Sequence, residues 1–377
     1  MAAPTPILET VSLVKQFGGG RQLFTRAPVV QAVNGVSIKV MDGETFAVVG
    51  ESGCGKSTLG RLMIRLLDPT SGDVVYRGRN LAGLSAEQMR KLRRELQIIF
   101  QDPFASLNPR MTAAQIVGEP IWLHGLAAGG ERRDRVLEIF DLVGLRPDMA
   151  ERYPHEFSGG QRQRIGIARA LAGQPQLILG DEPVSALDVS IQAQIINLLE
   201  ELKERLKLTL VVIAHDLAVI RHMSDHVAVM YLGEVVELAE TEELFEAPLH
   251  PYSQALLEAI PIPNPRGRRV RMPLQGDIPS PTNPPSGCRF HTRCPHARPV
   301  CAEERPVLTG VGGSGRQVAC HFWQEIQAAG ASPRLAVADS PALSARLALY
   351  RARQAGTAVG LVGEGAAGSN SLQPDMP

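Results

Sequence analysis

Four residues near the start of the chain have the types and the spacing of a phosphate-binding loop. The pattern G-x-x-x-x-G-K-[ST] is met by Gly50, Gly55, Lys56 and Ser57. Glycine lets successive backbone N–H groups turn toward one anion, and a helix that starts near the lysine adds its positive end. The lysine supplies a cation for the outer phosphates, and the serine hydroxyl can ligate magnesium. The pattern therefore predicts a nucleotide site, which also includes the loop residues Ser52, Gly53, Cys54 and Thr58.

The flanking sequence places this loop between a strand and a helix. Residues 45–50 form an apolar run typical of a buried strand, and residues 58–67 repeat apolar side chains at helical spacing. Strand, loop and helix thus follow in the order that phosphate binding needs. The alternative is a chance glycine-rich turn, and motifs further along the chain disfavour it.

The length and composition predict a cytoplasmic protein that is large enough for two domains. The 377 residues contain 39 Lys and Arg and 39 Asp and Glu, so no charge excess points to nucleic acid as a partner. The amino terminus has no basic and apolar leader, and no stretch approaches the roughly 18 apolar residues of a membrane span. Four of the five cysteines gather late in the chain, which in a reducing compartment favours a metal site over disulfides: Cys288, Cys294, Cys301 and Cys320.

Strand and helix patterns predict an α/β fold with two kinds of sheet. Residues 7–17 and 29–40 alternate polar and apolar positions, which is typical of an antiparallel β subdomain. Apolar strands at 177–179 and 209–213, separated by a helix at 191–206, are typical of a parallel sheet. The antiparallel part is expected to lie beside the parallel, nucleotide-binding sheet.

Changes in composition and in the periodicity of apolar residues along the chain predict three regions. Residues 1–255 form the nucleotide-binding domain, in which residues 102–164 carry short helical patterns and are predicted to be a helical insertion. Residues 256–327 are rich in proline and are predicted to form a small irregular cysteine module. The tail at 328–377 is expected to be disordered, apart from a helix at about 341–354.

Two acidic residues follow the apolar strand at 177–179. Asp181 at the strand tip can hold magnesium, and Glu182 can polarise the water that attacks the terminal phosphate. Such acids often mark only a strand and its turn. The phosphate loop earlier in the same chain favours the catalytic interpretation.

A second glycine turn with a hydroxyl occupies residues 157–161, at the start of another predicted helix, and is a second anion site. Two phosphate-binding loops for one nucleotide make little sense within one molecule. They make sense if two such chains face each other head to tail, so that each completes the other's site.

In this order the motifs resemble those of the ATP-binding subunits of the ABC transporter family. The resemblance covers residues from Phe17 to about Glu240 and implies a P-loop NTPase core that binds ATP. Besides the phosphate loop and the two acids, the matching residues are Gln101 of the Q-loop, Ser158, Gly159, Gly160 and Gln161 of the signature loop after Phe157, Asp188 of the D-loop, and the switch histidine His215.

The resemblance implies a role for each matching residue. Lys56 and His215 would bind the terminal phosphate, and Glu182 would activate the attacking water. The residues that would serve Mg²⁺ are Ser57, Gln101 and Asp181. The signature loop of one subunit would close on the nucleotide held by the other, and Asp188 would communicate across that interface. Phe17 either stacks on the adenine ring or packs as an ordinary strand aromatic.

The late part of the chain narrows the resemblance to the oligopeptide and dipeptide importers. Two segments show this resemblance. One is residues 279–295, which contain Asn-Pro-Pro-Ser-Gly-Cys, and the other is His-Pro-Tyr-Ser-Gln-Ala-Leu at 250–256. Importers of this kind commonly pair two different ATPase subunits, and the sequence Asn-Pro-Pro-Ser-Gly-Cys is similar to that of the F-type member. This implies a peripheral subunit at the cytoplasmic face of the cell membrane, paired with a paralogous ATPase and two transmembrane permease subunits, and served by an extracytoplasmic solute-binding protein.

Peptide import is the function that this resemblance implies, and short permease helices are expected to dock around residues 101–108. Import of nickel or another small solute is the alternative within the class. A soluble ABC ATPase acting on nucleic acid is disfavoured, because the chain shows neither a second cassette nor long coiled coils. The basic residues Arg266, Arg268, Arg269 and Arg271 are interpreted as a solvated loop.

The resemblance also implies an iron–sulfur cluster held by the four late cysteines. Four thiols match the ligand set of a [4Fe–4S] cluster or of a tetrahedral zinc ion, and the spacings lack the C-x2-C pairs usual for zinc ribbons. Zinc and unligated thiols remain alternatives, as does a redox-sensing role. His291, His296 and His321 are interpreted as bystanders, although any of them can replace a cysteine as ligand.

Overall fold

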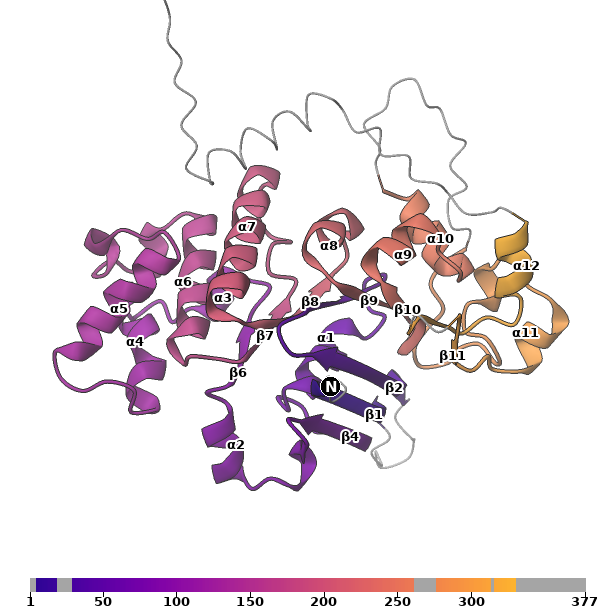
Figure 1. Ribbon diagram of the computed structural model, residues 1–377, viewed down its shortest axis with the longest axis horizontal. Coiled ribbons are helices and arrows are strands. Elements are labelled where there is room, and N and C mark those ends of the chain that lie inside the picture. The colour runs from indigo at the N-terminus through magenta and orange to yellow at the C-terminus, as the bar shows by residue number, and fades with distance from the viewer. Residues whose placement is uncertain (1–4, 19–28, 261–275, 313–314, 330–377) are drawn as a thin grey trace, which may run out of the picture. The chain divides into compact units, whose positions relative to one another are not determined.

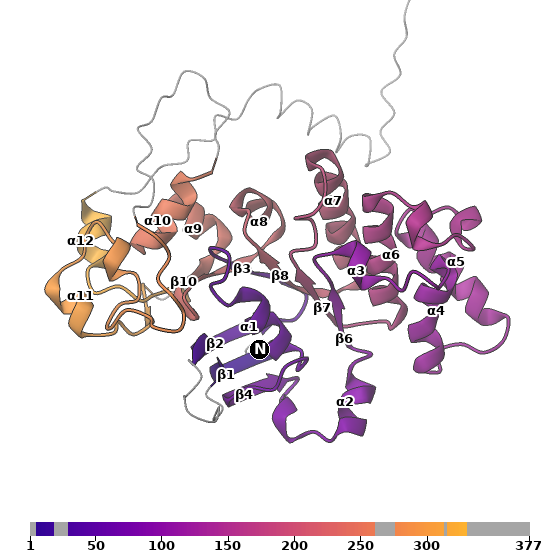
Figure 2. The same ribbon diagram turned by 180° about the vertical axis from the view of Figure 1, so that it is seen from behind.

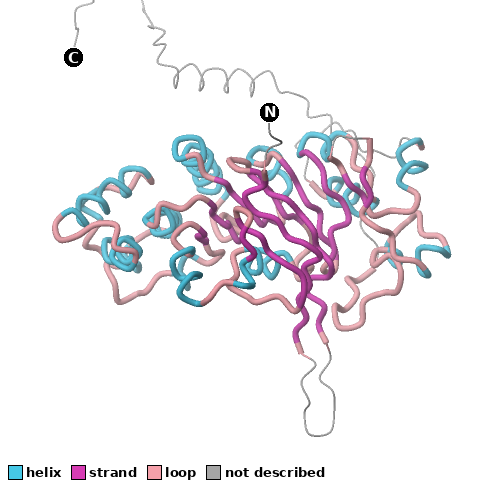
Figure 3. The backbone as a smooth tube through the Cα atoms, turned by 60° about the horizontal axis from the view of Figure 1, so that its bottom comes forward, coloured by secondary structure: helices cyan, strands magenta, loops and turns pink. Residues whose placement is uncertain are grey.

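The computed structural model describes residues 5–18, 29–260, 276–312 and 315–329, and these belong to one compact unit. The helix expected at 341–354, the tail from residue 330 and the basic residues 266–271 lie outside the described residues. Figure 1 colours the ribbon from the N-terminus to the C-terminus, and Figure 3 shows the strands gathered together with helices on their flanks.

An eight-stranded sheet carries the nucleotide-binding core, with the strand order β11-β12-β10-β9-β3-β8-β7-β6. The five strands from β9 to β6 run parallel, while β10, β12 and β11 are antiparallel additions at one edge. The bounds are β3 Thr45–Val49, β6 Leu96–Ile99, β7 Leu177–Asp181, β8 Thr209–Ala214, β9 His226–Tyr231, β10 Glu234–Glu240, β11 Thr309–Gly310 and β12 Gln317–Val318.

The central strands are apolar throughout because both faces of the sheet are covered. Every residue of β3, β7 and β8 is buried, as expected for parallel strands packed between layers of helices. Helix α7 (Val189–Leu206) buries one face through Ile195, Leu198, Leu199 and Leu202. The predicted parallel sheet is therefore confirmed.

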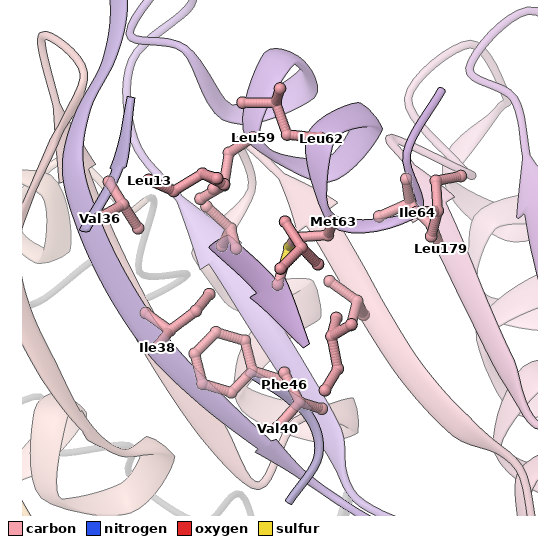
Figure 4. Close-up of a cluster of buried hydrophobic side chains, with 14 of the residues drawn as sticks. Leu13, Val36, Ile38, Val40, Phe46, Leu59, Leu62, Met63, Ile64 and Leu179 are labelled. Atoms are coloured by element: carbon pink, nitrogen blue, oxygen red, sulfur yellow. The ribbon is translucent and has the colours of Figure 1, made fainter. Parts of the chain in front are cut away.

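A four-stranded antiparallel sheet lies beside this core, in the order β2-β1-β4-β5. Its strands are β1 Pro6–Phe17, β2 Val30–Met41, β4 Ser71–Tyr76 and β5 Arg79–Asn80. Helix α1 (Lys56–Met63) contacts strands of both sheets (Figures 1 and 2). Figure 4 shows the shared core, in which Leu13 and Ile38 of the antiparallel sheet meet Phe46, Leu59 and Met63.

The predicted helical insertion, residues 102–164, contains helices α3, α4 and α5 and the start of α6, and Figure 1 shows α4, α5 and α6 side by side. Capping boxes fix two of the helix starts: Thr112 with Gln115 begins α4, and Ser158 with Gln161 begins α6. The bounds are α2 Ala86–Leu92 before the insertion, then α3 Pro103–Ser106, α4 Ala113–Leu123, α5 Glu131–Leu142 and α6 Gly159–Ala172.

The carboxy-terminal part packs onto the antiparallel edge of the large sheet. Strand β12 pairs with β10, and Arg316 just before β12 forms a buried ion pair with Glu237 at 2.7 Å. The remaining helices are α8 Leu217–Met223, α9 Thr241–Glu246, α10 Pro251–Glu258, α11 Pro299–Glu303 and α12 Trp323–Ala328. In the part of the chain that is described, no helix combines the length and apolarity needed to cross a bilayer.

Candidate functional site

The predicted site residues follow four neighbouring parallel strands. The phosphate loop comes after β3, Gln101 after β6, Asp181 ends β7, and His215 comes after β8. Because the carboxyl ends of parallel strands meet at one edge of a sheet, these side chains converge there, where open α/β sheets bind their ligands. The sheet order alone therefore assembles the site from segments that are far apart in the sequence.

The phosphate loop, residues 50–58, needs glycine at positions where other residues would clash. Gly50, Gly53 and Gly55 have φ values of 150°, 80° and 105°. A Cβ on Gly50 would lie 2.1 Å from the Met230 carbonyl oxygen, and one on Gly55 would lie 2.0 Å from the Ala32 carbonyl oxygen. The loop is thus pressed against β9 and β2, and its backbone conformation is open only to glycine.

Lys56 holds its charge over the loop. Its Nζ donates to the carbonyl oxygens of Gly50 and Glu51 at 2.8 and 3.0 Å, and the residue is 4% exposed. The Cys54 thiol points into the hydrophobic core, where burial raises its pKa. Of these two side chains, only that of Lys56 lies against the loop backbone, where it can reach a phosphate.

Ser57 and Asp181 form the pair that the sequence assigns to magnesium. Ser57 Oγ donates to Asp181 Oδ1 at 2.7 Å, and Arg61 lies 3.3 Å from the other carboxylate oxygen. Asp181 is 2% exposed, so its carboxylate is held by these contacts at the floor of the site. A hydroxyl and a carboxylate oxygen side by side fit the oxygen ligands that Mg²⁺ requires.

Glu182 is the centre of a second set of contacts. Its Oε2 accepts a hydrogen bond from Gln101 Nε2 at 2.9 Å and lies 3.2 Å from His215 Nδ1. The structure therefore brings Glu182, the predicted catalytic residue, together with Gln101 and His215. Gln101 contacts Glu182 and not the Ser57–Asp181 pair, with which the sequence grouped it as a magnesium residue. Glu182 has φ 49°, a left-handed conformation that is uncommon outside glycine.

The signature loop, residues 157–161, lies against the D-loop, residues 185–188. A Cβ on Gly160 would lie 2.6 Å from Ile191 Cγ2, and one on Gly159 would lie 3.5 Å from Leu187 Cδ2. Ser158 is exposed at the start of the fourteen-residue helix α6, whose amino-terminal end favours an anion. Its hydroxyl accepts the Gln161 N–H at 3.3 Å, and Asp188 immediately precedes α7.

Comparisons with known proteins place this site in a family. The ABC transporter family profile matches residues 33–185, and a profile described as "Oligopeptide/dipeptide transporter, C-terminal region" matches residues 236–301. The chain is 54% identical over 321 residues to the oligopeptide transport ATP-binding protein AppF of Bacillus subtilis, covering 84% of this chain and 97% of that protein. The chain belongs to the ABC transporter family.

Other relatives agree. The oligopeptide transport ATP-binding protein OppF of Salmonella typhimurium is 54% identical over 296 residues, covering 77% of this chain and 88% of that protein. A solved dimer of the ATP-binding cassette MJ0796 with ADP and Pi matches with a TM-score of 0.56 at 32% identity, covering 62% of this chain and 98% of that chain. This ABC transporter subunit is an ATPase whose activity is coupled to transport, and it acts with membrane-spanning permease subunits.

Phe17 lies at the end of β1 in this ABC transporter subunit. The residue is 40% exposed, and Lys15 Nζ lies 5.1 Å from the centroid of its ring. An exposed aromatic at the end of a strand is free to stack on a base, so the adenine role stays a prediction.

The four late cysteines of the ABC transporter subunit line one small pocket. Its walls include Phe290, Phe322 and Ile326 as well as Cys288, Cys294, Cys301 and Cys320. Burial raises the pKa of Cys288 to about 11 and that of Cys294 to about 12, so without a cation these two thiols stay protonated. Among the described residues, no group of three or more His, Cys, Asp or Glu side chains is arranged to hold a metal ion.

Two residues of the site were missed by the sequence reasoning. Tyr252 Oη accepts the Glu51 N–H of the phosphate loop at 2.8 Å, and the Arg293 guanidinium pairs with the Glu51 carboxylate at 2.7 Å. Neither belongs to a motif that binds nucleotide, and 201 and 242 positions separate them from Glu51. No local pattern could have revealed them.

Proposed function

We propose that this ATPase powers the import of oligopeptides across the cytoplasmic membrane, as one of two paralogous ATP-binding subunits at the cytoplasmic face. The observation that carries the proposal is the match of residues 236–301 to the carboxy-terminal region of oligopeptide and dipeptide transporters. The relatives AppF and OppF, both named as oligopeptide transport proteins, support the same class of cargo. An extracytoplasmic solute-binding protein would deliver the peptide to the permease.

The side chains at the strand ends support a simple division of labour in hydrolysis. The phosphate loop and Lys56 bind the phosphates of ATP. Ser57 and Asp181 would hold Mg²⁺, which neutralises charge on the phosphate oxygens. Glu182 takes a proton from the attacking water, and His215 orients Glu182 and the terminal phosphate. Gln101 donates to the same carboxylate oxygen that His215 contacts, so a displacement of Gln101 would change the position of the base.

The signature loop supports a site shared between two subunits. Ser158, Gly160 and Gln161 would contact the nucleotide held by the partner ATPase, through the amino-terminal end of α6. The packing of Gly159 against Leu187 ties this loop to the D-loop, so Asp188 would move with it. Closure of the two subunits around ATP would then drive the permease.

The helical insertion supports permease docking around residues 101–108. Phe104 in α3 is 63% exposed, and the Arg162 guanidinium lies 3.9 Å from its ring centroid. Arg162 follows the signature loop by one residue, and Gln101 precedes α3. A permease helix that binds at Phe104 would therefore lie close to Arg162, which adjoins the signature loop, and to Gln101, which contacts Glu182.

The thiol pocket supports the proposal of an iron–sulfur cluster. One zinc ion needs four sulfurs about 2.3 Å from a single centre, whereas a four-iron cluster distributes its thiolates around a larger body. Four cysteines that line one pocket match the ligand set of such a cluster. The cluster's positive irons would stabilise the thiolates that burial alone disfavours.

Reconstitution tests the transport proposal. The chain, its partner ATPase and the permease are placed in proteoliposomes with the cognate solute-binding protein, and uptake of labelled peptides and of nickel is measured with and without ATP. We expect ATP-dependent peptide uptake that Lys56→Ala abolishes. Uptake of nickel but of no peptide would refute the assignment of cargo.

Metal content tests the cluster proposal. The chain purified without oxygen should contain iron and acid-labile sulfide, and Cys294→Ser should reduce both. Cys54→Ala is the matched control, because that thiol lies in the hydrophobic core and should leave the iron content unchanged. A colourless preparation loaded with zinc would contradict the proposal.

A further inference from the structure

The segment 288–294 contacts two different parts of the molecule. Its two cysteines, Cys288 and Cys294, line the thiol pocket. Between them, Arg289, Phe290 and Arg293 lie against the nucleotide-binding core, and Arg289 and Arg293 are only 8% and 5% exposed at their side chains. Two buried arginines in an otherwise irregular module call for a specific explanation, because a buried charge is costly unless it is paired.

Arg293 is paired with the phosphate loop. Its two terminal nitrogens donate to the two carboxylate oxygens of Glu51, at 2.7 and 3.0 Å, and one of them also lies 3.4 Å from Tyr231 Oη. This is a bidentate arrangement, which fixes the orientation of the carboxylate as well as its distance. Glu51 is the second residue of the phosphate loop.

The backbone of Glu51 is held as well. Its N–H donates to Tyr252 Oη at 2.8 Å, and Tyr252 lies wholly buried in α10. The rings of Tyr231, Tyr252 and Phe290 pack together, with centroid separations of 4.7 to 5.3 Å. Phe290 of the C-terminal module therefore supports the tyrosine that holds the loop.

Arg289 reaches the other side of the loop. It pairs with Glu234 at 2.7 Å and donates to the Leu232 carbonyl oxygen and to Gln31 Oε1. Gly233, which follows Leu232 in the chain, donates its N–H to the Cys54 carbonyl oxygen within the phosphate loop at 2.8 Å. The module thus holds the loop directly through Arg293 and indirectly through Arg289.

A phosphate loop needs such support because its own sequence supplies little. Three of its residues are glycines in conformations that other residues avoid, and glycine loses the most conformational freedom on ordering. Loop N–H groups bind phosphate well only when they are already aimed at it. A fixed carboxylate and a fixed N–H at Glu51 order the loop at its entrance.

We propose that Arg293 is a positioning residue for ATP binding, which makes the phosphate loop depend on the C-terminal cysteine module through the Arg293–Glu51 pair. The role is distinct from the proposed metal site, because it needs the guanidinium and not the thiols. The proposal also does not depend on which cargo is transported, since it concerns only the affinity of the ATPase for nucleotide.

Nucleotide affinity of the full-length chain tests this proposal. We expect Arg293→Ala to raise the dissociation constant for MgATP by about ten-fold, since small displacements of positioned groups are costly, and Arg293→Lys to recover part of the loss. In the assembled complex the KM for ATP should rise more than kcat falls. Arg298→Ala is the matched control, because Arg298 pairs with Glu325 at the surface of the same module, and its affinity should match the wild type.

A neutral double variant separates position from charge. Arg293→Ala also leaves the Glu51 carboxylate unneutralised near the phosphates, whereas Glu51→Gln with Arg293→Met removes both charges. If position matters, the double variant still binds MgATP several-fold more weakly than the wild type. Wild-type affinity in the double variant, or in Arg293→Ala, would overturn the proposal. Should Arg293→Ala fail to fold, Tyr252→Phe tests the same loop, and unchanged affinity there would also overturn it.

Discussion

Ser57 Oγ donates a 2.7 Å hydrogen bond to Asp181 Oδ1, although 124 positions separate the two residues in the chain. The pair exists because β3 and β7 flank β8 in the parallel sheet and both end at the same edge. Asp181→Asn keeps the shape of this contact and removes the negative charge. We expect the Mg²⁺ concentration needed for half-maximal ATPase activity to rise by about 10- to 100-fold.

A magnesium titration of the purified complex measures that shift. Asp134→Asn, on the exposed face of α5, is the control and should leave the titration unchanged. An identical magnesium requirement in Asp181→Asn would mean that the carboxylate is not a magnesium ligand.

Replacement of Glu182 by glutamine should separate binding from turnover. Glutamine retains the size of the side chain, and an oxygen that can accept from Gln101, but it cannot take a proton from water. We expect kcat of the assembled complex to fall by about 10²- to 10⁴-fold while the affinity for MgATP stays within about two-fold. Glu201→Gln, exposed on α7, serves as the control. Near-normal turnover in Glu182→Gln would remove Glu182 from the mechanism.

The buried pair of Arg316 and Glu237 should be important for stability. Glu237 is 0% exposed and also accepts the N–H groups of Leu249 and His250, both at 2.9 Å. Arg316→Leu leaves this carboxylate buried without its counter-charge, so we expect a loss of about 3–5 kcal/mol in the free energy of unfolding. Urea denaturation measures the loss. Arg298→Leu removes an exposed ion pair of the same module and should change the midpoint little.

His226 gives the fold a pH dependence of known sign. Its Nδ1 lies 2.8 Å from Glu44 Oε2, and this hydrogen bond raises the pKa of His226 above its usual value near 6.5. The folded state therefore binds more protons than the unfolded state between about pH 6.5 and the raised pKa, and stability falls as pH rises through that window. Below pH 6.5 the contribution is fully present.

Denaturation midpoints at several pH values between 6 and 9 test this expectation. His226→Gln should flatten the decline, whereas His155→Gln, in an exposed 3-10 turn before α6, should leave it in place. A decline of the same size in His226→Gln would assign it to another group.

Local patterns were sufficient for the nucleotide-binding core and insufficient for what surrounds it. The glycines of the phosphate loop and the apolar strands β3, β7 and β8 are each constrained within a few neighbouring residues, so their spacing predicts them. Strand β12 has only two residues, 317–318, and becomes a strand because β10 lies beside it. Tertiary pairing of this kind leaves no periodicity in the sequence.

The charged residues of the C-terminal module show the same limit. In the sequence, Arg293 and Arg316 resemble the solvated residues of any irregular segment, yet both are buried and paired with carboxylates at least 79 positions away. Glu51 likewise lies at a variable position of the phosphate motif. Ion pairs between distant segments depend on how those segments pack, which spacing does not encode.

Strand β12 has one more consequence. Within the described residues it covers the edge of β10, through the pairs Glu237 with Val318 and Leu238 with Gln317. A chain cut before residue 276 would leave the N–H and C=O groups along that side of β10 unpaired. Open strand edges recruit strands from other molecules, so such a truncated chain is expected to self-associate and precipitate. By pairing with β10, this two-residue strand therefore protects the large sheet from aggregation.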